Sequence, residues 1–219
     1  QKVSYDEAKK TVIEALSPLG EDYIQILEKA FNSGWIDVYE NEGKHSGAYS
    51  WGAYGTHPFV LLNFDNKFGD MFTLAHEMGH AMHSYYTWDN QPFIYANYTI
   101  FLAEIASTVN ETLLINYLLK QTTIPEKTKY LLNYFMEQFR GTLFRQTMLA
   151  EFEMITHDMV ENGTPLTLEL LNKIYHDLNA KYYGPDVIID KEIDYEWARI
   201  PHFYTAFYVY QYATGYSAA

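Results

Sequence analysis

Residues 71–83 read Met71-Phe72-Thr73-Leu74-Ala75-His76-Glu77-Met78-Gly79-His80-Ala81-Met82-His83. Four residues advance an α-helix by just over one turn, so His76 and His80 share a face and can bind one metal ion. Glu77 lies beside such an ion, where its carboxylate can take a proton from an attacking water. Apolar side chains recur at helical spacing and predict a helix with one buried face: Met71, Leu74, Ala75, Met78 and Met82.

This pattern also has a purely structural explanation. Short motifs match by chance, and an ordinary helix can carry two partly buried histidines and one solvated glutamate. A metal centre therefore needs support from residues elsewhere in the chain.

The composition is that of a globular protein with an acidic balance. Hydrophobic residues make up 48% of the 219 residues. The sequence contains no apolar run of about 18 residues, so no membrane-spanning helix is predicted. The net charge of -13 argues against nucleic acid or an anionic membrane as a partner, and a solvated acidic surface explains most of it. Cysteine is absent, which excludes thiolate ligands and fits a cytoplasmic protein.

One segment, residues 35–64, has the character of a small β-sheet. Short runs at 35–39, 48–51 and 59–64 are separated by turn residues, glycines and a proline. We expect two or three antiparallel strands beside the metal-binding helix. In such an arrangement an edge strand can pair with an extended peptide.

The rest of the chain predicts helices, so the expected fold class is mainly α. Ser4 and Glu7 form a capping-box pattern that opens a helix ending near residue 16. In the helix after the metal-binding one, Phe101 and Leu114 are among the expected core positions. No repeat or linker is visible, so residues 1–219 are treated as one domain that is mostly helical from residue 68. The other helices are expected over 21–32, 71–86, 97–120, 125–161, 167–182 and 204–213.

Glu104 is the candidate for a third metal ligand. A catalytic zinc ion needs three protein ligands and one open position, and Glu104 is a carboxylate within an apolar and small-residue run, 101–109. Two antiparallel helices joined by a short loop can bring residues 76, 80 and 104 together. The alternative is that Glu104 lies on a solvated helix face.

Further residues are expected to support these ligands. Glu111, two turns beyond Glu104, can bond the second ring nitrogen of a histidine ligand, with Ser107 and Thr108 as alternatives. His83, one turn past His80, is interpreted as a supporting or core histidine, because catalytic sites leave the fourth position to water. Ordinary helix surface or helix packing explains each of these residues equally well.

The motifs together resemble the thimet oligopeptidase/oligoendopeptidase F family of zinc metallopeptidases. The H-E-x-G-H-x-x-H run at 76–83 and the E-x-x-S run at 104–107 match the family signature. Residues 46–50 with 58–64, and residues 200–213, resemble the oligoendopeptidase F branch. The resemblance covers nearly the whole chain and implies a zincin-like helical catalytic domain.

The resemblance implies a role for each site residue. One zinc ion per chain would be held by His76, His80 and Glu104, with Glu77 as general base and no other cofactor. The segment 202–210 would bind the scissile carbonyl and its oxyanion, which needs a hydrogen-bond donor. His202 and Tyr210 match this part best, and Tyr208 and Tyr204 are alternatives.

The expected function is therefore that of a zinc-dependent endopeptidase acting on oligopeptides. A carboxypeptidase on the same scaffold and a catalytically incomplete helical fragment are the two alternatives. Family members are considerably longer, so we expect this chain to be a fragment. The sequence leaves its oligomeric state open.

Overall fold

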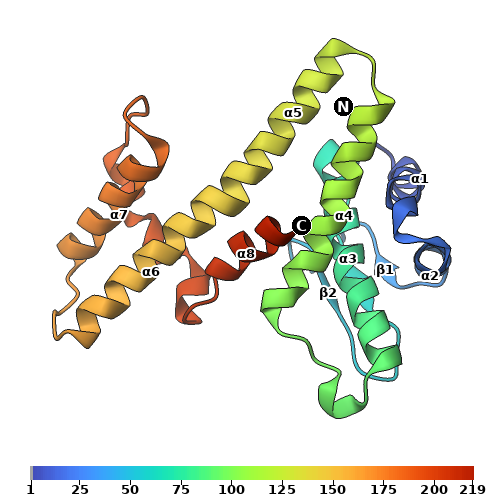
Figure 1. The fold of residues 1–219 in the computed structure, drawn as a ribbon, viewed down its shortest axis with the longest axis horizontal. Helices are drawn as coiled ribbons and strands as arrows, with labels where there is room; N and C mark the ends of the chain where they lie inside the picture. The colour runs from blue at the N-terminus through green and yellow to red at the C-terminus, as the bar shows by residue number, and fades with distance from the viewer. Residues whose placement is uncertain (1) are drawn as a thin grey trace. The chain divides into compact units, whose positions relative to one another are not determined.

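The structure, a computed structural model, describes residues 2–219 as two compact units (Figure 1). The first unit extends to Asn133 and includes Ala218–Ala219, and the second comprises Tyr134–Ser217. Both are mainly helical, which confirms the predicted fold class.

Four helices build most of the first unit. Helices α3 and α4 form its main packing pair, and α1 packs against both. The predicted core face of α3 is confirmed, because Met71, Leu74, Ala75, Met78 and Met82 are all at most 2% exposed. The helices are α1 (Tyr5–Leu16), α2 (Glu21–Asn32), α3 (Phe68–Asn90) and α4 (Ile100–Gln121), with short 3₁₀ helices at Ser17–Leu19 and Phe93–Tyr95.

The capping box at the start of α1 forms as predicted. The Ser4 hydroxyl accepts a hydrogen bond from the Glu7 backbone N–H at 3.3 Å, and the Glu7 carboxylate accepts one from the Ser4 N–H at 2.9 Å. Both bonds satisfy backbone donors that a helix N-terminus otherwise leaves without partners. Val12 and Leu16 then lie fully buried on the inner face of α1.

The small sheet is mixed, which corrects the antiparallel sheet predicted from the sequence. Its strands are β1 (Ile36–Asp37), β2 (Tyr49–Trp51) and β3 (Phe59–Leu61), in the order β1-β3-β2. Strand β2 is antiparallel to β3, but β1 is parallel to it. The run around β3 is the most apolar of the three, with Val60 and Leu62 at most 2% exposed. In the central position, β3 has a neighbouring strand on each side, and it separates β1 from β2.

The face of α4 that is buried differs from the prediction. Leu114 is fully buried as expected, but Phe101 is 41% exposed. Helix α4 approaches α3 too closely for large side chains, and its buried polar groups form hydrogen bonds. In the first half of α4 the buried side chains are small or polar, and the apolar Leu114 and Ile115 follow them. The small or polar ones are Ala103, Glu104, Ser107, Thr108 and Asn110.

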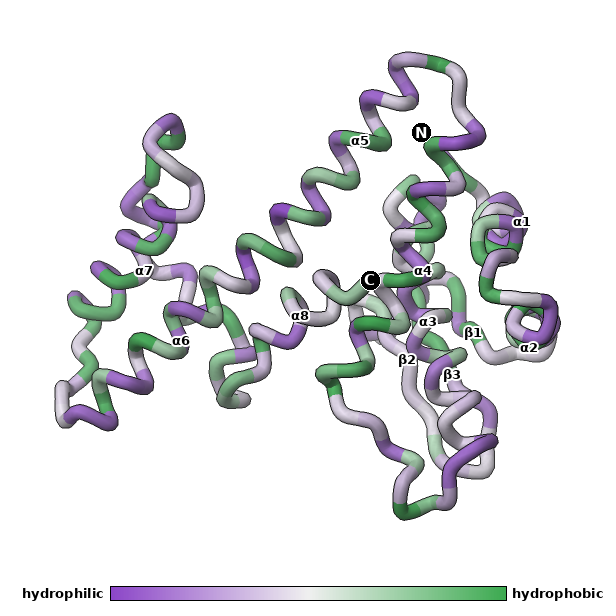
Figure 2. Tube along the Cα trace, viewed as in Figure 1, coloured by the Kyte–Doolittle hydropathy of each residue, from purple (hydrophilic) through white to green (hydrophobic). Residues whose placement is uncertain are grey.

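The long helix predicted over 125–161 is present, with a π-helical turn inside it. Helix α5 (Pro125–Phe139) is followed by the π-turn Arg140–Phe144 and by α6 (Arg145–Glu161). Apolar and polar residues alternate along α5 and α6 in Figure 2, as in amphipathic helices. Helix α7 (Leu168–Tyr183) packs on α6.

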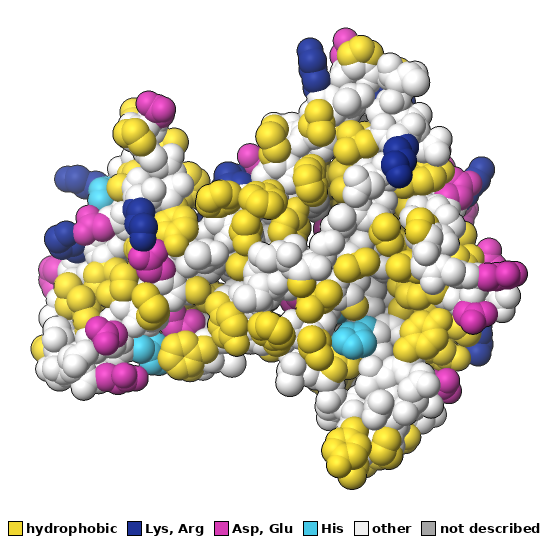
Figure 3. Space-filling view, in the orientation of Figure 1, with side chains coloured by type: hydrophobic (Ala, Val, Ile, Leu, Met, Phe, Trp, Pro, Cys, Tyr) yellow, Lys and Arg dark blue, Asp and Glu magenta, His cyan; other side chains and the backbone are white. Residues whose placement is uncertain are grey.

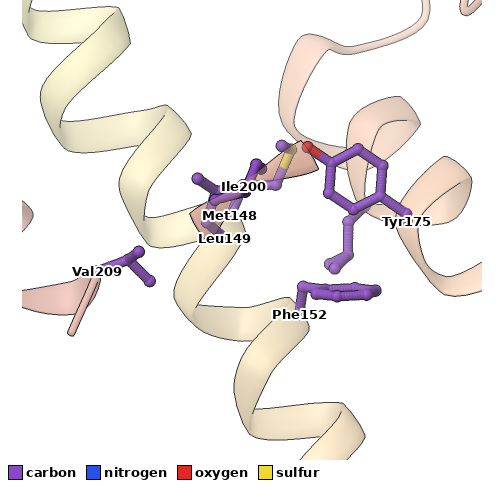
Figure 4. Close-up of a cluster of buried hydrophobic side chains, with 7 residues drawn as sticks. Met148, Leu149, Phe152, Tyr175, Ile200 and Val209 are labelled. Atoms are coloured by element: carbon purple, nitrogen blue, oxygen red, sulfur yellow. The ribbon is translucent and has the colours of Figure 1, made fainter. Parts of the chain in front are cut away.

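The core of the second unit is a cluster of buried apolar side chains (Figure 4). It combines residues of α6 and α7 with two residues from the irregular segment that follows. A 3₁₀ helix, Lys191–Arg199, precedes that segment. The cluster consists of Met148, Leu149, Phe152, Tyr175, Leu178, Ile200 and Val209.

The last helix is displaced from the predicted range 204–213. A 3₁₀ helix forms at Pro201–Tyr204, and α8 runs over Tyr210–Ala218, past Gly215. Residues 205–209 stay non-helical because Phe207 has φ 58°, in the left-handed region. Aromatic and β-branched residues, which dominate this stretch, are also weak helix formers.

The acidic side chains are dispersed on the face of the molecule that Figure 3 shows. This distribution agrees with a solvated acidic surface. None of the helices between residues 2 and 219 has the length and apolar character needed to span a bilayer.

The capping box yields a stability prediction. Ser4→Ala removes the hydroxyl that bonds Glu7, so we expect the free energy of unfolding to fall by about 1 kcal/mol. Urea denaturation followed by circular dichroism measures this change. Ser46→Ala, in an exposed turn, serves as the control and should have no effect. Equal stability of both variants would contradict the prediction.

Candidate metal centre

Helices α3 and α4 bring His76, His80 and Glu104 together. The two histidine Nε2 atoms are 3.2 Å apart, and Glu104 Oε2 lies 3.5 Å from His76 Nε2 and 3.8 Å from His80 Nε2. A tetrahedral ion with ligands at about 2.0–2.2 Å separates neighbouring ligand atoms by roughly 3.3–3.6 Å. One of the three separations lies inside this range and the other two lie just outside it, so the atoms are close to the spacing of zinc ligands. Within residues 2–219, these three form the group that could hold a metal ion.

The close approach of α3 to α4 occurs at Gly79. A Cβ atom built on Gly79 would lie 2.6 Å from Ser107 Cα and 2.7 Å from the Ala106 carbonyl oxygen. Real Cβ atoms do not approach backbone this closely, so the residue facing α4 here must be glycine. Gly79 lies one residue before His80, and Ser107 lies one turn after Glu104. The contact therefore sets the distance between the histidines and the carboxylate.

The two histidines carry opposite pKa shifts. Burial acts to lower the pKa of His76, but the Glu111 hydrogen bond and the nearby carboxylates raise it to about 9. Burial, together with His76 and His83, lowers the pKa of His80 to about 3. The two imidazole rings thus lie among carboxylates that favour a positive charge at this place. A divalent cation between them would supply the positive charge that these carboxylates favour.

Glu77 is buried beside this group. It is 7% exposed, and its Oε2 atom has no hydrogen-bond partner among the residues that the structure describes. Burial raises the pKa of Glu77 to about 7, and the opposing effects of His76 and the Ser50 backbone hydrogen bond only partly offset it. A carboxylate with an unpaired oxygen and a pKa near neutrality has the properties of a general base.

Glu111 contacts His76 in the predicted way. Its Oε1 atom lies 2.5 Å from His76 Nδ1, which leaves Nε2 directed toward His80 and Glu104. A carboxylate in this position fixes the ring and increases the basicity of the opposite nitrogen. The alternatives, Ser107 and Thr108, instead bond Glu104. The Ser107 hydroxyl reaches its Oε2 at 3.3 Å, and the Thr108 hydroxyl donates to its carbonyl oxygen.

His83 lies outside the candidate metal-binding group, and its interpretation as a supporting or core residue stays a prediction. Its ring stacks on Tyr98, with ring centres 3.7 Å apart. The Tyr98 hydroxyl bonds Ser84 at 2.7 Å and lies 3.5 Å from the His80 carbonyl oxygen. Stacking on Tyr98 thus places His83 beside the backbone of a candidate ligand.

The sequence reasoning missed Asn110 and Tyr23. The Asn110 side chain donates to the Ala75 carbonyl oxygen at 3.0 Å, one residue before His76, and also bonds the Tyr23 hydroxyl. Burial raises the pKa of Tyr23 to about 12, so its hydroxyl keeps its proton. These bonds connect α2, α3 and α4 next to the backbone that carries His76. The sequence could have indicated Asn110, because an asparagine within an apolar helix needs hydrogen-bond partners when it is buried.

The residues predicted to bind the oxyanion belong to the second unit. The rings of His202 and Tyr208 are 5.3 Å apart, and the Tyr212 hydroxyl lies 3.3 Å from His202 Nε2. Tyr210 is 42% exposed and Tyr204 is 88% exposed. Tyr212 was not predicted, although it follows Tyr208 by four residues. The role of this segment in catalysis stays a prediction.

Strand β2 lies against the helix that carries the histidines. The Ser50 backbone forms a hydrogen bond with the Glu77 carboxylate. Strand β2 is at an edge of the sheet, with Tyr49 52% and Trp51 77% exposed. An edge strand therefore runs directly beside the candidate general base.

Comparisons with known proteins give a consistent result. A model described as "Peptidase family M3" matches residues 3–219. Oligopeptidase PepF of Bacillus subtilis is 56% identical, with 100% of this chain and 32% of that protein covered. The chromosomal oligoendopeptidase F of Lactococcus lactis subsp. cremoris is 52% identical, with coverages of 100% and 36%. The structure of oligoendopeptidase-F from Enterococcus faecium matches with a TM-score of 0.66 at 42% identity, covering 98% of this chain and 31% of that one. The chain thus spans about a third of the length of these relatives.

The helix contact at Gly79 leads to a second prediction. Gly79→Ala places a methyl group against the backbone of α4, so the helices must separate. We expect a loss of about 1–3 kcal/mol in the free energy of unfolding, and weaker binding of added zinc. Gly141→Ala, where the new methyl group meets open space, should cause neither change. Unfolding and zinc titration of both variants measure the difference, and zinc binding unchanged in Gly79→Ala would contradict it.

Proposed function

Because this chain belongs to peptidase family M3, we propose that it carries the metal-binding and general-base groups of a zinc-dependent endopeptidase acting on short peptides. The convergence of His76, His80 and Glu104 beside the buried Glu77 carries this proposal. Relatives named oligopeptidase and oligoendopeptidase F support the substrate class. Since the chain covers about a third of them, the activity is proposed for the protein that contains it.

In this proposal His76, His80 and Glu104 hold one zinc ion. A bound zinc ion would polarise the peptide carbonyl and lower the pKa of water. Glu77 accepts a proton from the attacking water at its unpaired Oε2 atom and transfers it to the leaving amine. Glu111 keeps the His76 ring oriented through Nδ1.

The family resemblance carries the proposal for the oxyanion-binding groups. His202 and Tyr210 donate hydrogen bonds to the scissile carbonyl oxygen as it gains negative charge. Tyr208 is the alternative to Tyr210, and its ring contact with His202 supports it. Preorganised donors of this kind stabilise the transition state more than the substrate.

The substrate backbone is proposed to pair with strand β2. This strand is at the sheet edge, and its Ser50 bonds Glu77, so a peptide added there would run past the general base. Short peptides are the proposed partners. The net charge of -13 opposes nucleic acid binding, and the absence of cysteine supports a cytoplasmic location.

A combined metal and cleavage assay tests the proposal. Metal content is measured by mass spectrometry, and cleavage of an internally quenched, end-blocked peptide is followed with and without chelator. We expect one zinc ion per chain and cleavage that chelator abolishes. Cleavage of this end-blocked peptide would exclude the carboxypeptidase alternative, since an exopeptidase cannot cut it.

The variant arm of this assay is Glu77→Gln. It removes the proton acceptor but keeps the side-chain shape, so kcat should fall by at least about 10²-fold with zinc content unchanged. The exposed Glu126→Gln in α5 is the matched control and should retain wild-type kcat. Full activity in Glu77→Gln would refute the assignment of the general base.

Glu111 gives a prediction about zinc affinity. Glu111→Gln removes the charge that orients and polarises His76, so we expect about 10–100-fold weaker zinc binding. Competition with a chromogenic chelator measures this Kd. Lys120→Gln, a charge-removing change at an exposed position of the same helix, should leave the Kd unchanged. Equal Kd values in the two variants would exclude the supporting role of Glu111.

A further inference from the structure

Glu153 of α6 is a buried carboxylate that the proposed mechanism does not use. It is 4% exposed, and its Oε1 atom accepts a hydrogen bond from the Phe207 backbone N–H at 2.5 Å. Within residues 2–219 it forms no ion pair. Burying a carboxylate without a cation costs free energy, and an apolar residue would pack there more favourably. The presence of a glutamate therefore calls for an explanation in its contact with Phe207.

Phe207 has an unusual backbone conformation. Two non-glycine residues of the described chain have a positive φ, Asn66 and Phe207, both at 58°. Asparagine tolerates the left-handed region, whereas a bulky aromatic residue rarely adopts it. Such a conformation persists where surrounding contacts enforce it, and it is common at functional sites. Here α6 supplies those contacts, because Glu153 bonds the Phe207 N–H and the His157 ring lies 4.8 Å from the Phe207 ring.

The chain on both sides of Phe207 is anchored in the core. Ile200 and Val209 are 6% and 1% exposed and belong to the buried cluster of the second unit, with Met148 and Leu149 of α6 (Figure 4). The path between the two anchors therefore depends on the turn at Phe207. His202 precedes this turn and Tyr208 follows it.

We propose that Glu153 is a positioning residue for His202 and Tyr208. Its carboxylate holds the Phe207 N–H, which keeps the turn left-handed and places the Tyr208 ring 5.3 Å from that of His202. Glu153 acts through the Phe207 backbone and not on the substrate. The inference rests on the proposed role of His202 in binding the scissile carbonyl, with Tyr208 as the alternative to Tyr210.

The first test compares Glu153→Met with Glu153→Gln in the zinc-loaded full-length protein. Methionine has a similar length but no acceptor for the Phe207 N–H, so kcat should fall at least about tenfold while KM changes by less than about twofold. Glutamine keeps a carbonyl oxygen at this position, so its kcat should stay within about threefold of wild type. The thermal midpoint and zinc content of each variant are measured in parallel.

A second pair of variants tests the backbone conformation directly. Phe207→Asn and Phe207→Val both remove the aromatic ring, so both lose the contact with His157. Asparagine tolerates a positive φ and the β-branched valine does not. We expect kcat to be about tenfold lower for valine than for asparagine. This pair decides the question if Glu153→Met fails to fold.

The outcomes separate this inference from the proposed function. Wild-type kcat in a folded Glu153→Met variant overturns the inference. Equal losses of kcat in Glu153→Met and Glu153→Gln also overturn it, because they would mean that the charge of Glu153 matters and not its bond to the Phe207 N–H. Equal kcat in the two Phe207 variants also overturns it. Wild-type kinetics in Tyr208→Phe and His202→Gln together would refute the proposed role of the segment, and the inference with it.

Discussion

The geometry of the candidate metal centre depends on the backbone contact between α3 and α4 at Gly79 and Ser107. Two helices at ordinary distance would place a layer of large side chains between them. Glycine removes that layer on α3, and small residues remove it on α4. A carboxylate on α4 can then reach the imidazoles on α3 with ligand atoms 3.2–3.8 Å apart.

This close approach buries polar groups, and hydrogen bonds compensate the free-energy cost of their burial. Glu111 bonds His76, Ser107 and Thr108 bond Glu104, and Asn110 bonds the backbone beside His76. Buried networks of this kind are rigid when they are fully satisfied. Glu77 departs from this pattern, with one buried oxygen that has no partner among the described residues. The unsatisfied atom belongs to the proposed base, where an unoccupied acceptor is useful.

In the second unit, a non-helical segment also needs contacts that fix its conformation. An irregular segment that carries His202 and Tyr208 cannot rely on helix hydrogen bonds to fix its conformation. Two apolar anchors, Ile200 and Val209, fix its ends in the core. A buried carboxylate, Glu153, bonds the backbone at the turn between them. Local precision in a non-helical segment thus comes from contacts with a rigid helix.

The sequence by itself determined the features that repeat along one element. Helical periodicity gave the buried face of α3, and the spacing of His76, Glu77 and His80 gave their common location, because both follow from one helix turn. The isolated Glu104 and its distance from Glu111 indicated the partners on the next helix. The mixed sheet, the polar face of α4, the turn at Phe207 and the roles of Asn110 and Glu153 were decided by the tertiary structure. Each depends on which distant residue packs beside it, and local spacing carries no information about that.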